Sequence, residues 1–338
     1  MEPPRGHAER STPSPLFHYS TYKTITMQDP ISEKLNQSNR PTIVAASRLI
    51  LWAAIGLWAT TLLELSLSGG VGAALLNLAY YLPFVALPVA LYMRSRPGIG
   101  EAMRLKPLPM LPMLSVALLA LISVYAASIM AGLWSGLLER LGLPNVAGAA
   151  VPQSERELAL SILSMAALPA VCEELLFRGL VLAAWEGRGT RYAIGVTALL
   201  FALLHGNLQG LPAYLLVGAL AGFVTFALDS LYAGIVYHTI YNAACLAIPF
   251  LLRNSAGGEL TLDAPMVFSL LLELTMLLAL MAVILVSLRL RARREGIEPI
   301  PRIRRPLELG EKAMLAVAVL AMLATTVAVL TIAATLAV

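Results

Sequence analysis

The sequence predicts an all-α membrane protein, a polytopic bundle of about eight to nine transmembrane helices. Hydrophobic residues occupy 58% of the 338 positions and charged residues only 13%, whereas soluble domains carry about 25% charged residues. The mean hydropathy is +0.77. The apolar residues also gather in stretches long enough to cross a hydrocarbon core of about 30 Å. Together these features exclude an ordinary soluble domain.

Nine such stretches follow one another along the chain, separated by polar or charged connections. They span residues 42–67, 71–93, 108–138, 158–185, 192–208, 211–228, 231–252, 265–288 and 313–338. The ends of the fifth and sixth stretches are the least sharply defined. Residues 1–41 are polar, with scattered proline and serine, and do not resemble a signal peptide. We expect them to form a disordered cytoplasmic tail, and residues 42–338 to form the membrane domain.

Basic residues predict the orientation of the bundle, because cytoplasmic loops are enriched in lysine and arginine. Such residues follow the second, fourth and eighth stretches, and the last of these connections is the most basic, with arginine at 289, 291, 293, 294, 302, 304 and 305. The alternate connections carry few. The pattern predicts a cytoplasmic amino terminus and a carboxyl terminus outside.

The net charge of +4 is therefore a topology signal first. It also provides a basic surface for the anionic headgroups of the lipid bilayer, and it requires no nucleic-acid partner. The expected location is a cell membrane, with a prokaryotic plasma membrane favoured and the eukaryotic endoplasmic reticulum as the alternative.

The fourth stretch contains two adjacent glutamates and an arginine, Glu173, Glu174 and Arg178. A carboxylate at bilayer depth costs about 2.5 kcal/mol or more, so a pair of them suggests chemistry. Helical residues four apart lie on one face, whereas residues five apart diverge by about 140°. Arg178 should therefore pair with Glu174 and leave Glu173 free to act as a base. Pro169 should kink the helix just before this site.

Two histidines lie in other predicted spans, His205 four residues after Phe201 and His238 four residues before Asn242. The spacing places His238 and Asn242 on one helix face, where both could stabilise a developing oxyanion. His205 could serve as a second base or orient a water molecule. Phe201 is interpreted as packing that positions His205.

Glu-Glu-x-x-x-Arg, Phe-x-x-x-His and His-x-x-x-Asn, in this order on three membrane helices, resemble the motifs of the CPBP family of intramembrane endopeptidases. This family includes the CAAX prenyl proteases and bacteriocin-processing relatives. The resemblance covers about residues 158–250, which we take as the catalytic core. It implies cleavage of a peptide or protein substrate that is lipidated or membrane-anchored. CAAX-like tails, leader peptides and carboxyl-terminal sorting segments all fit that description.

The resemblance also implies a role for each motif residue. A water molecule would be activated by Glu173 and His205, and the oxyanion would be held by His238 and Asn242. The supporting residues would be Glu174, Arg178 and Phe201.

Metal dependence is a separate question. One glutamate and two histidines have the composition of a catalytic zinc site, so a zinc-dependent protease would use Glu173, His205 and His238 as ligands. The His-Glu-x-x-His helix is absent, however, and the three residues come from three helices. A mechanism without a metal or other cofactor is therefore favoured. Cys172 and Cys245 form no Cys-x-x-Cys pair and are interpreted as packing residues.

Two other classes of protein share some of these features. Buried glutamate, histidine and arginine also form the relays of proton-coupled transporters. No second copy of the Glu-Glu-x-x-x-Arg helix is evident, although inverted repeats would be typical of a transporter. A noncatalytic immunity or scaffold protein could also keep the fold, but it would have no need of all three motifs.

Overall fold

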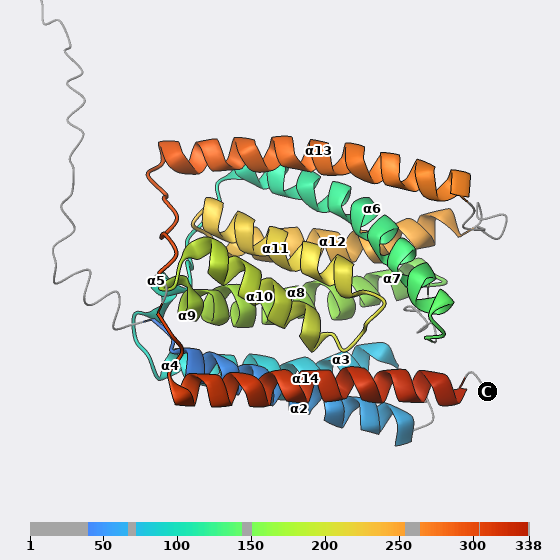
Figure 1. Cartoon of the computed structure of the whole chain (residues 1–338), viewed down its shortest axis with the longest axis horizontal. Helices are drawn as coiled ribbons and strands as arrows, with labels where there is room; N and C mark the ends of the chain where they lie inside the picture. Colours follow the sequence, from blue (N-terminus) through green and yellow to red (C-terminus); the bar gives the residue numbers. More distant parts are fainter. Residues whose placement is uncertain (1–39, 67–71, 144–150, 254–263, 304, 337–338) are drawn as a thin grey trace, which may run out of the picture.

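The structure is a computed structural model that describes residues 40–66, 72–143, 151–253, 264–303 and 305–336. The expected cytoplasmic tail lies almost entirely outside the described residues. Within them the chain forms a bundle of roughly aligned helices, and no strand is present in these segments (Figure 1). Seven helices are long and apolar enough to cross a membrane, and two shorter apolar helices lie between them in sequence. This confirms the predicted fold class.

The helices follow the order of the predicted spans. The α-helices are α2 Ile43–Ser66, α3 Ala73–Tyr80, α4 Leu87–Arg94, α5 Ile99–Ala102, α6 Met110–Arg140, α7 Glu155–Ser161, α8 Leu168–Glu174, α9 Leu182–Glu186, α10 Thr190–Leu204, α11 Leu211–Ala227, α12 Leu231–Leu252, α13 Ala264–Arg294 and α14 Leu309–Leu336. The π-helical segments are η1 Tyr81–Ala86, η2 Ile162–Ala167 and η3 Leu175–Val181.

Two predicted spans are built from several helical segments in succession. The second runs through α3, η1 and α4, and the fourth runs from α7 through η2, α8 and η3 to α9. In both spans a π-helical segment is followed by a leucine and then a proline, Pro88 in α4 and Pro169 in α8. Proline cannot donate a backbone hydrogen bond and clashes with the carbonyl four residues earlier. The wider π-helical turn accommodates Pro169, where the sequence predicted a kink.

The fifth and sixth spans are shorter than the sequence suggested. Helix α10 has 15 residues and α11 has 17, so each is about 22 to 26 Å long, less than a typical hydrocarbon core. The predicted fifth span continued to residue 208, but the helix ends at Leu204 and the chain turns through residues 205–210. The positive φ of 61° at Gly206 forms part of this turn.

Close packing holds α10 and α11 together. An added Cβ at Gly218 would lie 3.0 Å from the Cα of Ala198, and one at Gly222 would lie 3.2 Å from Ile194. Two glycines four residues apart therefore let the two helix backbones approach closely, as is common between membrane helices. The short helices form the centre of the bundle, between α6 and α13 on one side and α2 and α14 on the other (Figure 1).

The predicted cytoplasmic connections all lie at one end of the bundle, at the left of Figure 1. They also contact one another. Arg104 forms ion pairs with Glu186 at 2.7 Å and with Asp229 at 3.1 Å, and Arg188 pairs with Glu311 at 2.8 Å. We refer to this as the basic end. The structure thus groups these connections as predicted, while the side of the membrane that they face stays a prediction.

Candidate active site

The predicted ion pair between Glu174 and Arg178 is present and completely enclosed. Arg178 Nη1 donates to Glu174 Oε1 at 2.7 Å, and both side chains are 0% exposed. Arg178 Nη2 donates to the carbonyl of Gly218 on α11 at 2.9 Å. The guanidinium also lies over the ring of Phe201, 4.5 Å from its centroid. A buried charge needs such partners. The contacts of the Arg178 guanidinium therefore connect α8 and η3 with α10 and α11.

Glu174 has a second partner that the sequence did not predict. His238 Nδ1 lies 2.9 Å from Glu174 Oε1, so the carboxylate holds both the arginine and the imidazole. Gly234, one turn earlier on α12, makes room for the carboxylate. An added Cβ there would lie 2.7 Å from Glu174 Oε2, a contact that real structures do not tolerate. Glu174 is therefore both a structural ion-pair partner and the group that orients His238.

Glu173 faces a different direction, as the helical phase predicted. Its Oε1 accepts a hydrogen bond from the hydroxyl of Tyr81, the first residue of η1. Its Oε2 has no hydrogen-bond partner among the described residues, and it lies 3.9 Å from Nε2 of His238. The residue is only 7% exposed. One carboxylate oxygen is thus fixed by Tyr81, while the other is buried beside His238 without a hydrogen bond among the described residues.

His205 lies directly after α10, at the turn that ends this helix. Its Nδ1 is 2.8 Å from the carbonyl of Phe201, and a carbonyl can only accept, so Nδ1 must carry a proton. In the neutral ring Nε2 is then an acceptor. Tyr214 stacks on the imidazole, with ring centroids 4.0 Å apart, and Phe201 packs edge-on at 4.7 Å. These contacts fix the ring, which agrees with the packing role predicted for Phe201.

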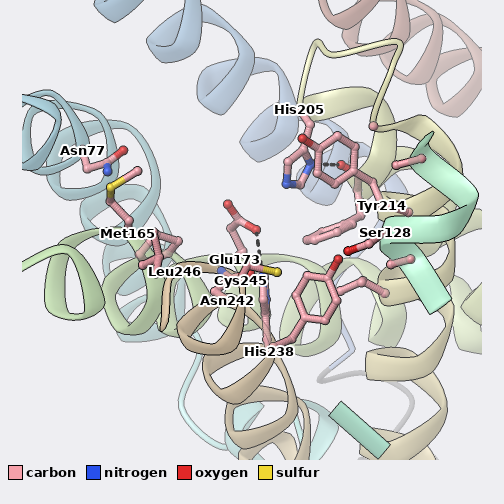
Figure 2. A pocket seen from close by; sticks show the side chains of 18 of the residues that line it. Asn77, Ser128, Met165, Glu173, His205, Tyr214, His238, Asn242, Cys245 and Leu246 are labelled. Atoms are coloured by element: carbon pink, nitrogen blue, oxygen red, sulfur yellow. Dashed lines mark hydrogen bonds and ion pairs between the residues drawn. The ribbon is translucent and has the colours of Figure 1, made fainter. Parts of the chain in front are cut away.

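A cavity of about 490 Å³ brings the predicted residues together. Its lining includes Glu173, His205, His238 and Asn242, from the fourth, fifth and seventh predicted spans. Figure 2 shows these side chains around one space, with His205 on the opposite side from His238 and Asn242. Glu174 and Arg178 do not line it. The structure therefore separates the residues expected to act on a substrate from the Glu174–Arg178 ion pair, whereas Phe201, the third supporting residue, also lines the cavity.

The same cavity corrects one sequence interpretation. Both cysteines were expected to be packing residues, and Cys172 is indeed buried. Cys245 is instead exposed, and it lines the cavity one turn after Tyr241. The two thiols thus have different surroundings although both lie in apolar spans.

The geometry does not group the alternative zinc ligands. Within the described segments, no set of three histidine, cysteine, aspartate or glutamate side chains is placed to hold a metal ion. Glu173, His205 and His238 line one cavity, but their ring nitrogens and carboxylate oxygens are not arranged as a ligand set. The choice between a direct and a zinc-dependent mechanism is left to experiment.

Tyr81 and Tyr214 were not identified from the sequence. Tyr81 is 92 residues before Glu173 and belongs to no recognisable motif. Tyr80 and Tyr81 are adjacent tyrosines in an otherwise apolar span, which is a weak signal that a polar group is needed there. Tyr214 has no comparable signal. Their proximity to the site depends on how the helices pack.

Comparison with known protein families adds independent information. Residues 155–244 match the family model of type II CAAX prenyl endopeptidases, Rce1-like. The segment contains every motif residue named above, whereas Tyr81 lies outside it. This confirms the resemblance to the CPBP family and supports, at the level of the family, a CAAX-type intramembrane endopeptidase. No curated protein and no solved structure matched the chain.

Proposed function

We propose that this protein is an intramembrane endopeptidase that hydrolyses a peptide bond of a membrane-associated protein or peptide. One observation supports this most strongly. Glu173, with one carboxylate oxygen held by Tyr81 and the other without a hydrogen-bond partner among the described residues, lines the same cavity as His205, His238 and Asn242. A base, an orienting group and oxyanion donors around one space are what acyl transfer to water requires.

Glu173 and His205 activate the water molecule in this proposal. Glu173 accepts one proton from the water, and Nε2 of His205, the acceptor nitrogen in the neutral ring, orients it. The water oxygen forms a bond to the scissile carbonyl carbon, and the carbonyl oxygen becomes an oxyanion. When the intermediate collapses the carbon–nitrogen bond breaks, and Glu173 returns the proton to the leaving amine. The products are a new carboxyl terminus and a new amino terminus.

His238 and Asn242 stabilise the oxyanion. Because the Glu174 carboxylate can only accept, Nδ1 of His238 carries a proton at their 2.9 Å contact. In the doubly protonated ring, Nε2 donates to the oxyanion. Asn242 offers its side-chain amide from the next turn of α12. Donors fixed in advance in this way lower the cost of the developing charge.

Substrate cleavage by the purified protein tests the proposal. The full-length chain is reconstituted in liposomes with a panel of membrane-embedded peptides that includes a farnesylated peptide with a CAAX ending. Products are identified by mass spectrometry. We expect cleavage of at least one peptide at a single bond, and none with the Glu173→Gln variant. Equal cleavage by this variant would contradict the role given to Glu173.

A proton-coupled transporter is the rival that the same residues could form. It predicts a different result from the same liposomes. Proton flux that depends on Glu173, with no cleavage of any peptide in the panel, would favour the transporter. The Rce1-like match of residues 155–244 supports the protease instead.

A further inference from the structure

The two short helices do not extend to one end of the bundle. The turn between α10 and α11 stops well before the ends of α6, α13 and α14, on the side away from the basic end (Figure 1). Counted from the first residue of α10, this turn lies about 22 Å along the bundle, short of a hydrocarbon core of about 30 Å. Non-helical backbone at such a depth is tolerated where it is buried in protein or lines a water-filled cavity.

Two polar groups of this turn form hydrogen bonds within the protein. Trp134 Nε1 on α6 donates to the carbonyl of Leu208 at 2.9 Å, and the amide of Gly210 donates to Asn207 Oδ1 at 3.0 Å. His205 and Gly210, at its two ends, both line the cavity described above. The recessed turn therefore forms part of the cavity wall.

Three further lining residues, from three other helices, lie in the same half of the bundle. Ser128 on α6 and Cys245 on α12 are exposed residues of the lining. Ser128 is about 27 Å from the basic end of its helix, and Cys245 is about 21 Å from the basic end of α12. Asn77, also in the lining, lies one turn from the start of α3 and about 26 Å from Arg94, at the basic end of the second span. These three lining residues are thus remote from the basic connections.

The geometry points to substrate entry from the half of the bundle opposite the basic end. We propose that, because the basic end is predicted to be cytoplasmic, the substrate of this site is a membrane-anchored segment presented from the external side. This inference rests on the proposed peptidase function and narrows it. Among the substrate classes considered, carboxyl-terminal sorting segments and leader peptides that emerge on the external side fit this entry. A prenylated tail on the cytoplasmic leaflet does not.

Cys245 offers a native probe of the entry side. Of the two cysteines, Cys172 is buried, whereas Cys245 is exposed and lines the cavity. Intact cells and inside-out vesicles containing the full-length protein are treated with a membrane-impermeant thiol reagent, and the labelled cysteine is identified by mass spectrometry. We expect labelling of Cys245 in intact cells and protection in inside-out vesicles. Cys245→Ala should abolish the signal.

A second variant shows which side of the membrane the reagent reaches in each preparation. Arg294 is exposed at the end of α13 that carries the basic connection. In the Cys245→Ala background, Arg294→Cys should be labelled only in inside-out vesicles. Labelling of Cys245 and of the cysteine at position 294 from the same side would overturn the inference, as would labelling of Cys245 from neither side in membranes. The labelling requires no cleavage of a peptide. Its result therefore tests the side of substrate entry separately from the proposed peptidase activity.

Discussion

Glu173 and Glu174 are adjacent in the sequence but have contrasting surroundings. Glu174 is completely enclosed and holds Arg178 at 2.7 Å and His238 at 2.9 Å. Glu173 lines a cavity of about 490 Å³, with one oxygen bound by Tyr81 and the other without a hydrogen-bond partner in the described part of the chain. Consecutive helical residues are rotated by about 100°. Two consecutive residues can therefore differ in role, one carboxylate being structural and the other able to act on a ligand.

The contrast teaches that a buried charge alone does not indicate a catalytic role. A buried ion pair is weak evidence for stability, since its desolvation can offset the attraction, but the loss of one partner leaves the other charge exposed to an apolar interior. Glu174 and Arg178 fit this structural description. Glu173 differs because it lines a cavity that a ligand can enter, which Glu174 does not.

The largest expected difference is between the two glutamine variants of these carboxylates. Glu173→Gln should lower the rate of cleavage by about 10⁴-fold, since a general base is lost, and should leave the thermal unfolding midpoint unchanged. Glu174→Gln should lower the free energy of unfolding by about 3 kcal/mol, because Arg178 loses its charged partner. Cleavage assays and thermal unfolding in detergent measure both quantities.

Glu64→Gln is a suitable control for this pair, because Glu64 lies near the end of α2 and is exposed. It should change neither quantity. A lowered unfolding midpoint in Glu173→Gln, or an unchanged one in Glu174→Gln, would contradict the assignment of the two carboxylates.

His205 should have the next largest effect. His205→Ala removes the acceptor nitrogen that orients the water and should reduce kcat by about 10³-fold, within the range of positioned acid–base groups. Because Tyr214 and Phe201 pack on this ring, the variant His205→Phe is made beside it to retain the packing. Both variants should show this loss of kcat. Activity in His205→Phe would show that only packing is required.

Asn242 is expected to matter less than the two groups that activate water. Asn242→Ala should lower kcat by about 10²-fold, the typical cost of removing one oxyanion donor. KM should change little, because the interaction forms mainly in the transition state. Steady-state kinetics on the reconstituted protein test this. A higher KM with normal kcat would instead indicate that Asn242 binds the substrate in its ground state.

Tyr81 should have the smallest effect, because it positions Glu173 and does not touch the water. Tyr81→Phe removes one hydrogen bond to a charged group and should lower kcat about tenfold, with unchanged KM and an unchanged unfolding midpoint. Tyr80→Phe is the matched control, because Tyr80 is also buried but does not line the cavity. A lowered unfolding midpoint with normal kcat would indicate that Tyr81 contributes only to packing.

Hydropathy and helical spacing predicted much of this arrangement. The nine apolar stretches correspond to seven long helices and two short ones, and the spacing of four residues placed Arg178 on Glu174. These features depend on residues close in sequence, for which helix geometry is sufficient. The grouping of the basic connections at one end also followed from their alternation along the chain.

The contacts between distant helices could not be predicted in the same way. The hydrogen bond from Tyr81 to Glu173 joins residues 92 positions apart, and that between His238 and Glu174 joins residues 64 positions apart. Both depend on how α12 and the second span pack against α8. The early end of α10 was also missed, although His205, Gly206 and Asn207 interrupt the apolar pattern and Gly206 adopts a positive φ.

The central claim is that Glu173 and His205 activate a water molecule for peptide hydrolysis, and one measurement tests it most directly. The purified protein is treated with a strong chelator and incubated in ¹⁸O-labelled water with a membrane-embedded peptide that it cleaves. We predict that cleavage continues and that mass spectrometry finds one ¹⁸O atom in the new carboxyl terminus, since no ion is needed to generate the nucleophile. Loss of cleavage on chelation with recovery on adding zinc would contradict this mechanism and make Glu173, His205 and His238 the candidate ligands.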